Sequence, residues 1–489
     1  NPENCIQCNR CAYVCPHAVI RPVALTAEEA ANAPEGMKTL DLTGMKEYKF
    51  TMSVSALDCT GCGSCVNVCP GKKGAKALAM ENLEASADEQ KYFDYTVKLP
   101  VKEDVIAKFK EATVKGSQFK QPLLEFSGAC AGCGETPYAK LITQLFGDRM
   151  YIANATGCSS IWGNSSPSTP YTVNAKGQGP AWSNSLFEDN AEFGYGMLLA
   201  QRAIRDGLKA KVEDVVANGT NEDVKAAGQE WLDTFSVGAT NGAATDKLVA
   251  ALEACGCDKA KEILAQKDFL AKKSQWIFGG DGWAYDIGFG GVDHVLASGR
   301  DINVMVFDTE VYSNTGGQSS KSTPTGAIAQ FAAGGKETKK KDMASIAMSY
   351  GYVYVAQISM GADFNQTVKA IAEAEAYPGP SLIIAYAPCI NHGIKKGMAK
   401  AQTEEELAVK VGYWHNFRFN PAAEGNKFSL DSKAPSMEDY QAFLDGEVRY
   451  NSLKRQNPEK AARLFAKNEA EAKARFEYLQ KLIALHSAE

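Results

Sequence analysis

The chain lacks long apolar segments and blocks of charge of one sign. No uncharged apolar run approaches the ~18 residues that a membrane-spanning helix needs, and the start does not resemble a signal peptide. Acidic and basic residues are mixed along the sequence and the net charge is −6, which does not indicate a surface for polyanions. We therefore expect a soluble, cytoplasmic protein with no membrane segment and no nucleic-acid partner.

The chain also lacks an initiator methionine. It opens at Asn1-Pro2-Glu3, and a cysteine of the metal-ligand type already stands at Cys5. We expect that the N-terminal part of a longer polypeptide precedes it. The 489 residues, 45% of them hydrophobic, are enough for about three globular domains with real cores.

Cysteine is plentiful and unevenly placed. Eight of the 14 cysteines lie in the first 69 residues, in two runs of the same spacing. Scattered cysteines in a secreted domain would suggest disulfides, whereas such grouping indicates thiolate clusters in a reducing cytoplasm.

Each run reads Cys-x-x-Cys-x-x-Cys-x-x-x-Cys-Pro. This spacing is typical of bacterial ferredoxins with two [4Fe–4S] clusters, in which the fourth cysteine of each run binds the other cluster. Zinc is disfavoured, because its sites usually pair two Cys-x-x-Cys knuckles. The intervening residues 16–58 are longer than a compact ferredoxin needs and suggest an insertion. The predicted ligands of the first cluster are Cys5, Cys8, Cys11 and Cys69, and those of the second are Cys59, Cys62, Cys65 and Cys15.

A glycine-rich turn follows a short β-prone run at 276–278. Gly280-Asp281-Gly282 lets the backbone turn tightly and opens a predicted helix, whose N-terminus favours diphosphate, while Asp281 offers a hard oxygen to Mg²⁺. A second predicted strand at 302–307 ends in Asp308-Thr309. The arrangement resembles the thiamine diphosphate motif, in which Gly-Asp-Gly precedes a metal-binding loop. The alternative is a glycine-rich strand-to-helix turn of any α/β protein.

Four predicted strands end in residues able to bind a ligand or metal. In an open parallel α/β sheet, such strand ends meet at one edge. Cys130 and Cys133, in a Cys-x-x-Cys pair, could join two strand-end cysteines in a third cluster, or all four could be buried core cysteines. The strands 152–155, 275–278, 302–307 and 382–386 end respectively in Cys158, Gly280-Asp281, Asp308-Thr309 and Cys389.

The remaining segments offer weaker signals. We expect residues 184–275 to be mostly helical, with a looser stretch at 238–245 and ordinary thiols at Cys255 and Cys257. The basic run 335–341 is interpreted as a solvated loop, and 352–357 as one more strand. Helix-start patterns at 436–439 and 457–459 predict a helical tail without chemistry. His17 and His392 are interpreted as hydrogen-bonded neighbours of cluster loops rather than ligands.

In this order, the motifs resemble the pyruvate:ferredoxin oxidoreductase family over roughly residues 1–400. The resemblance implies an α/β fold in which a parallel-sheet thiamine diphosphate-binding domain is preceded by a two-[4Fe–4S] ferredoxin-like α+β domain and followed by a helical tail. The implied domains are 1–100 (ferredoxin-like), 101–412 (thiamine diphosphate, a proximal [4Fe–4S] cluster and a helical insertion) and 413–489 (C-terminal helices). The motifs that carry the resemblance, besides the two cysteine runs, are Cys130-x-x-Cys133-Gly134-Glu135, Gly157-Cys158, Gly280-Asp281-Gly282, residues 309–314 and Pro388-Cys389.

The resemblance also implies a site. Mg²⁺ would be bound by Asp281, Thr309 and the backbone of Val311, and Asn314 would lie near the reacting thiazolium as the catalytic residue. The implied ligands of the third cluster are Cys130, Cys133, Cys158 and Cys389. The implied cofactor contacts are Glu135, Cys158, Gly280, Asp281, Gly282, Trp283, Thr309, Glu310, Val311, Tyr312, Ser313 and Asn314.

The implied activity is oxidative decarboxylation of pyruvate with coenzyme A to acetyl-CoA and CO₂, with electrons passing through three [4Fe–4S] clusters to ferredoxin or flavodoxin. The family's partner domains, which complete the thiamine and coenzyme A sites, are not recognisable here, so we expect this chain alone to be inactive and a homodimer to be the working form. The alternatives are another 2-oxoacid as substrate (2-oxoglutarate, a branched-chain acid or indolepyruvate), a polyferredoxin without thiamine chemistry, and a non-redox thiamine decarboxylase, which the clustered cysteines oppose.

Overall fold

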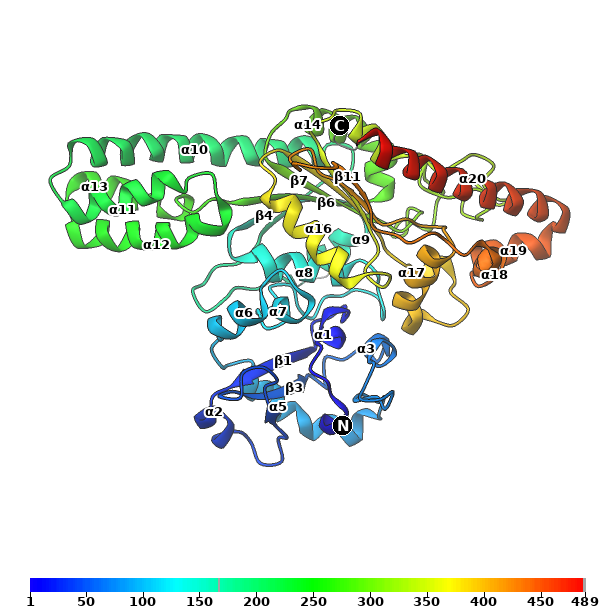
Figure 1. The fold of residues 1–489 in the computed structure, drawn as a ribbon, viewed down its shortest axis with the longest axis horizontal. Helices are drawn as coiled ribbons and strands as arrows, with labels where there is room; N and C mark the ends of the chain where they lie inside the picture. The colour runs from blue at the N-terminus through cyan, green and yellow to red at the C-terminus, as the bar shows by residue number, and fades with distance from the viewer. Residues whose placement is uncertain (166–167, 487–489) are drawn as a thin grey trace.

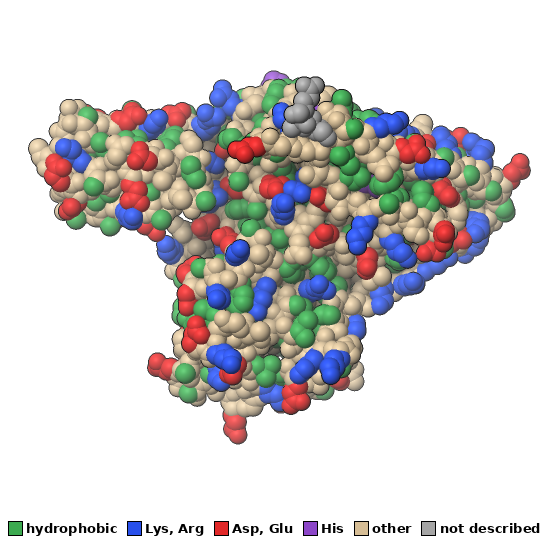
Figure 2. All heavy atoms as spheres, in the orientation of Figure 1, with side chains coloured by type: hydrophobic (Ala, Val, Ile, Leu, Met, Phe, Trp, Pro, Cys, Tyr) green, Lys and Arg blue, Asp and Glu red, His purple; other side chains and the backbone are tan. Residues whose placement is uncertain are grey.

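A computed structural model describes residues 1–165 and 168–486. Figure 1 shows a central sheet domain, a small N-terminal domain on one side of it, a helical arm projecting laterally and a C-terminal helical segment on the opposite flank. Acidic and basic side chains intermingle over the visible face in Figure 2, as the mixed charge pattern of the sequence predicts. In the part of the chain described, no helix is both long enough and apolar enough to cross a bilayer.

The N-terminal domain is built around a small antiparallel sheet with the order β1-β3-β2. Its strands are β1 (Ile20–Leu25), β2 (Leu40–Asp41) and β3 (Lys49–Val54). All three lie between the two cysteine runs, so residues 16–58 are the scaffold of this domain and not merely an insertion. Its helices are α1 (Arg10–Tyr13), α2 (Ala27–Ala31), α3 (Ser64–Val68), α4 (Leu83–Ser86), α5 (Gln90–Thr96), α6 (Glu103–Phe109) and α7 (Val114–Ser117).

The central sheet has the order β11-β10-β8-β9-β7-β6-β4-β5 among the described residues. The four strands expected to end at the site are confirmed as β4, β6, β7 and β9, and the strand expected at 352–357 is β8, whereas β5 was not predicted. The strands are β4 (Met150–Ala155), β5 (Ala181–Ser185), β6 (Ser274–Gly280), β7 (Ile302–Asp308), β8 (Tyr354–Ile358), β9 (Pro380–Tyr386), β10 (Phe417–Phe419) and β11 (Phe428–Leu430).

The sheet is mixed, which corrects the expectation of a purely parallel sheet. β10 pairs antiparallel with both β8 and β11, while the other strand pairs are parallel. β10 and β11 come from the segment predicted to be helical. The reason is local: in β10, Phe417 and Phe419 are buried and Arg418 alternates to the other face, where it pairs with Glu373 and Asp431.

Strand register fixes where the site forms. Asn154 pairs with Phe278, Gly280 with Phe307, and Asp308 with Tyr386. The carboxyl ends of β4, β6, β7 and β9 therefore stand side by side, as a parallel sheet requires.

Helices cover both faces of the sheet. One face packs against α8 (Thr136–Phe146) and α16 (Phe364–Ala376), and the other against α10 (Asn190–Asn218), α14 (Phe289–Ala297) and α15 (Met343–Met348). A short helix, α9 (Cys158–Ser160), follows β4, and α17 (Ala401–Lys410) lies beside α3.

The arm in Figure 1 extends from α10 and adds α11 (Glu222–Asp233), α12 (Gly238–Cys255) and α13 (Asp258–Leu264). It has its own hydrophobic core around the fully buried Trp231. The stretch 238–245 is helical, contrary to the prediction of a loose segment. Tertiary contacts override its low helix propensity, because the buried Asn241 accepts hydrogen bonds from Arg205 and from the amide of Lys272.

The tail contains α18 (Tyr440–Asp445), α19 (Val448–Gln456) and α20 (Pro458–Leu485). The helix start expected at Asn457 is confirmed, because its side chain accepts from the amide of Lys460 at 3.0 Å. α20 packs on α19 and on β11. The tail thus completes both the sheet edge and one flank of the domain.

Candidate active site and cluster-binding loops

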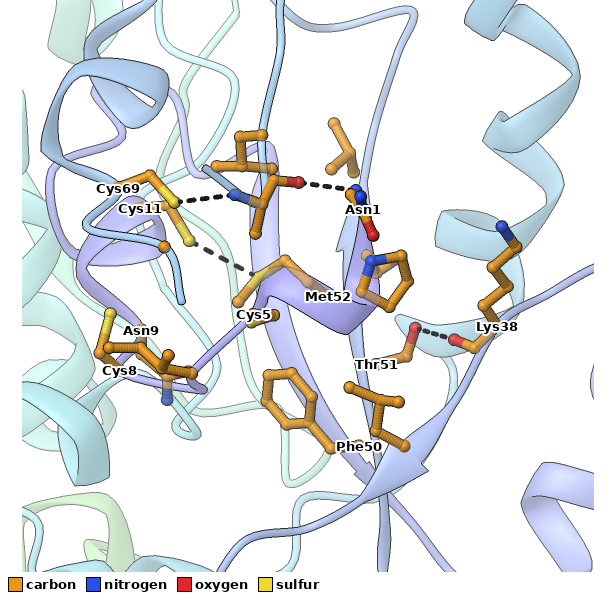
Figure 3. A pocket seen from close by; sticks show the side chains of 18 of the residues that line it. Asn1, Cys5, Cys8, Asn9, Cys11, Lys38, Phe50, Thr51, Met52 and Cys69 are labelled. Carbon is orange, nitrogen blue, oxygen red and sulfur yellow. Dashed lines mark hydrogen bonds between the residues drawn. The ribbon is translucent and has the colours of Figure 1, made fainter. Parts of the chain in front are cut away.

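The two ferredoxin-type cysteine runs lie together because α1 packs against α3. Cys5, Cys8, Cys11 and Cys69 line one cavity of about 310 Å³, and Figure 3 shows these four side chains on the same side of it. Cys15 instead lies near the second run. Burial raises the pKa of Cys65 to about 12, and the thiols of Cys15, Cys62 and Cys59 contribute. The structure therefore groups the eight thiols in the crossed pattern that the spacing predicts.

The two runs share one backbone design. In each run, the residue two positions after the first cysteine has a left-handed backbone, with φ 55° at Gln7 and 69° at Gly61. The amide of this residue donates to the sulfur of that cysteine, at 3.4 Å in the first run and 3.5 Å in the second. A third amide, of Ala77, points at the sulfur of Cys69 at 3.4 Å. Amides directed at sulfur stabilise thiolates and influence cluster potentials.

The turn after β6 meets the loop after β7 at a cluster of oxygens. The Thr309 hydroxyl lies 3.0 Å from both Asp281 Oδ1 and the Val311 carbonyl oxygen. The single hydrogen of the Thr309 hydroxyl can be donated to only one of these two acceptors. The other oxygen therefore lies close to the hydroxyl oxygen without a hydrogen bond between them. Such a set of oxygens suits a hard cation such as Mg²⁺.

Electrostatics at this point also favour a cation. Asp281 is fully buried, and burial together with the neighbouring Asp308 raises its pKa well above the usual range. Asp308 is compensated by Lys340 at 2.9 Å, whereas within the described residues Asp281 accepts from the neutral donors Thr309 and Ser320, and Lys340 lowers its pKa less than burial and Asp308 raise it. A bound divalent cation would stabilise the Asp281 carboxylate.

The two glycines of the turn, Gly280 and Gly282, differ in whether packing against the rest of the protein requires glycine. A Cβ on Gly282 would lie 2.4 Å from the Tyr312 ring, so the loop after β7 can pack on the turn only if position 282 is glycine. Among the described residues, the nearest protein atom to a Cβ on Gly280 would be the Phe307 carbonyl oxygen, at 3.9 Å. Packing within the protein therefore does not demand glycine at position 280.

The four remaining candidate ligands meet at one place. Cys130, Cys133, Cys158 and Cys389 line a cavity of about 110 Å³ together with Glu135, Thr309 and Asn314. The Cys158 sulfur is 3.2 Å from the Ser313 hydroxyl, which is 3.3 Å from the Thr309 hydroxyl. A short series of polar contacts therefore connects the cysteine cavity to Asp281.

Glu135 occupies the wall between these features. It is buried, accepts a 2.7 Å hydrogen bond from the Trp162 indole, and burial raises its pKa to about 7. Trp162, in the short helical segment Ile161–Ser165, was not predicted, because an isolated tryptophan gives no signal in sequence. His392 and His17 are hydrogen-bonded neighbours, as interpreted, since they lie 2.7 Å from the Thr309 carbonyl and 3.1 Å from the Ser127 carbonyl.

The side chain of Glu310 has protein partners on every side. It binds Lys340 at 2.9 Å, Arg449 at 2.8 Å and the Tyr413 hydroxyl at 2.6 Å, on a backbone with φ 60°. Burial alone would raise its pKa, but Lys340 and Arg449 lower it to about 2. Any contact of Glu310 with a cofactor would therefore use its backbone.

Two basic residues pair with Glu310 in ways that the sequence did not predict. Lys340, in the run interpreted as solvated, is largely buried between Asp308 and Glu310, because these carboxylates need counter-charges. Arg449, from the tail in which we predicted no chemistry, forms a buried ion pair with Glu310 across 139 residues of sequence. Such distant pairings leave no local pattern that could predict them.

In the described residues, no three His, Cys, Asp or Glu side chains converge tightly enough to hold a single metal ion. In a cubane, each cysteine binds a different iron, so four ligands surround a cluster without converging on one point. Cys255 and Cys257 lie far along the chain from these loops, with their sulfurs 2.9 Å apart.

Two family models match the chain. "Thiamine pyrophosphate enzyme, C-terminal TPP binding domain" matches residues 250–385, which include the turn at Asp281 and the loop after β7. "4Fe-4S dicluster domain" matches residues 4–73, which include both cysteine runs.

Full-length relatives match nearly the whole chain. It is 57% identical to pyruvate-flavodoxin oxidoreductase of Enterobacter agglomerans over 98% of its residues and 41% of that protein. It is 58% identical to pyruvate:ferredoxin oxidoreductase of Moorella thermoacetica over 98% of its residues and 42% of that protein. Pyruvate dehydrogenase [NADP(+)] of Euglena gracilis is 49% identical over 99% of the chain and 27% of that protein. The chain is therefore a close homologue of the pyruvate:ferredoxin and pyruvate-flavodoxin oxidoreductases, and spans about 41% of their length.

Proposed function

We propose that this chain supplies the diphosphate half of a thiamine-dependent active site and the electron path of a pyruvate:ferredoxin or pyruvate-flavodoxin oxidoreductase. The observation that carries the proposal is the series of contacts from Cys158 through Ser313 and Thr309 to Asp281, each 3.0–3.3 Å long. It connects the four-cysteine cavity to the oxygens at the strand ends that we propose bind a cation. Names of the relatives supply the substrate and the acceptors.

The residues around Asp281 fit Mg²⁺ and a diphosphate. Asp281, Thr309 and the Val311 carbonyl would hold the metal, and the amides after Gly280 would face the phosphates. When bound, thiamine diphosphate supplies a nucleophilic carbon and an electron sink for decarboxylation of a 2-oxoacid. The buried His392, whose pKa burial lowers to about 3, stays neutral and fixes the Thr309 carbonyl.

The cavity walls would keep water away from the reacting groups. Ile161, Trp162 and Pro388 line it beside the cysteines, and the Trp162 indole orients the Glu135 carboxylate. A dry site strengthens each electrostatic interaction within it. Asn314, at the same cavity, is the residue we place next to the thiazolium.

We further propose three [4Fe–4S] clusters. The cysteines form three groups in the structure, with Cys255 and Cys257 apart from them: two groups lie in the N-terminal domain and one at the strand ends. The chain would work as part of a longer polypeptide that adds the aminopyrimidine and coenzyme A sites, in a homodimer. Another 2-oxoacid substrate would leave the described residues in the same roles.

Iron counting tests the third cluster. The reconstituted chain should contain about twelve irons, and Cys389→Ser about eight, because one cubane holds four. Cys257→Ser is the matched control and should keep the full number. About eight irons in the unmodified chain would leave Cys130, Cys133, Cys158 and Cys389 as ordinary thiols.

Cofactor binding tests the cation site. Asp281→Asn keeps the shape but removes the anionic ligand, so Mg²⁺-dependent binding of thiamine diphosphate, measured by calorimetry, should weaken by at least about tenfold. Asp293→Asn is the control, since Asp293 accepts only from Tyr350 on the outer side of α14. Unchanged affinity in Asp281→Asn, or no binding by the unmodified chain, would favour a polyferredoxin without thiamine chemistry.

Urea unfolding tests whether the ion pair between the C-terminal tail and the loop after β7 stabilises the domain. Arg449→Met leaves Glu310 and Glu447 buried with one cation fewer, and should lower the free energy of unfolding by about 3–5 kcal/mol. Arg455→Met, on the exposed face of the same helix, should change it by no more than about 0.5 kcal/mol. Equal effects of the two substitutions would show that the buried pair does not stabilise the domain.

A further inference from the structure

Lys140 is a buried cation with no carboxylate partner. It lies on α8 of the central domain, is 2% exposed, and its ammonium reaches into the N-terminal domain. There it donates to the carbonyl oxygens of Ala12 and Tyr13, the latter at 3.1 Å. Within the described part of the chain it makes no ion pair, and Arg21, the other nearby cation, is paired with Glu125.

A charge buried in this way is costly unless negative charge compensates it. Burial lowers the pKa of Lys140 to about 8, and the groups that act against this lowering are Cys15 and Cys11. These two cysteines belong to different groups: Cys11 lines the cavity with Cys5 and Cys8, whereas Cys15 lies beside Cys59 and Cys65. Lys140 therefore stands between the two ferredoxin-type sites.

We propose that Lys140 is a counter-charge shared by the two ferredoxin-type clusters, raising the reduction potentials of both and more strongly that of the cluster bound through Cys15. A fixed positive charge stabilises the more negative, reduced cluster, and low surrounding polarity makes its effect large. The inference rests on the two clusters of the proposed function. The carbonyl contacts alone require only a hydrogen-bond donor, so the charge itself has to be tested.

Lys115 provides a natural comparison. It lies near Cys8 and Cys5, is only half-buried, and stacks over the Phe109 ring at 3.9 Å. Solvent screens its charge, and it faces one cysteine group only. Its removal should therefore move one potential slightly.

The experiment is a redox titration of the reconstituted chain, followed by electron paramagnetic resonance, in Lys140→Gln, Lys140→Met, Lys140→Arg and Lys115→Gln. Lys140→Gln keeps a donor for the Ala12 and Tyr13 carbonyls but removes the charge. This substitution should lower the reduction potential of the cluster bound through Cys15 by at least about 59 mV, which is a tenfold less favourable reduction for a one-electron couple. The potential of the other cluster should also fall, by a smaller amount. Lys140→Met should behave likewise, and Lys140→Arg should stay close to the unmodified protein.

The proposal would be overturned if, at full iron content, the equilibrium constants for reduction of both clusters in Lys140→Gln stayed within twofold of those in the unmodified chain. If Gln and Met variants lose iron while the Arg variant retains it, the need for charge is supported; loss of iron in the Arg variant as well would assign Lys140 a packing role and overturn it. An unmodified chain without ferredoxin-type clusters would instead refute the proposed function, so the two failures are distinguishable.

Discussion

The parallel pairing of β4, β6, β7 and β9 is the constraint on which the site depends. Each strand delivers a different group to one edge: a cysteine loop after β4, the Gly-Asp-Gly turn after β6, the Thr309 loop after β7 and Cys389 after β9. A shift of one residue in any pairing would move the side chain of Asp281 or Thr309 to the other face. The contact distances between these loops are therefore consequences of strand register.

Burying charge at that edge shapes the rest of the molecule. Asp308 and Glu310 leave solvent as the loop folds, and unpaired buried carboxylates would be strongly destabilising. Lys340 and Arg449 compensate them, which ties a distant loop and the C-terminal helices to the cation site. The left-handed backbone of Glu310 is held in place by this network. Residues with no contact to a cofactor can thus determine whether the loop keeps its shape.

The sequence predicted what depends on local spacing or strand periodicity. Both cysteine runs and the Gly-Asp-Gly turn are local patterns, and the buried strands are apolar runs of ordinary length. The rule that parallel strand ends share an edge left the meeting of Cys130, Cys133, Cys158 and Cys389 open against buried core cysteines, and the family resemblance implied it. Lys340, Arg449 and Lys140 could not be found, because each acts on residues that folding brings together from far along the chain. The short strands β5 and β10 were missed because neighbouring strands, not their own composition, stabilise them.

The same distinction applies to the junction between the two domains that bear cysteine groups. The Phe126 amide donates to the His17 carbonyl at 2.9 Å, Asn67 donates to the Ala399 carbonyl at 2.8 Å, and a Cβ on Gly132 would clash with Met398. These contacts join the loops of the three cysteine groups, through backbone atoms between Phe126 and His17 and through the side chain of Asn67 at Ala399. Hydrogen bonds across a junction resist sliding, since sliding would separate each donor from its acceptor. The junction holds the cysteine groups of the two domains in a defined arrangement, and in the proposal for Lys140 it lets a side chain from one domain set the electrostatic field within the other.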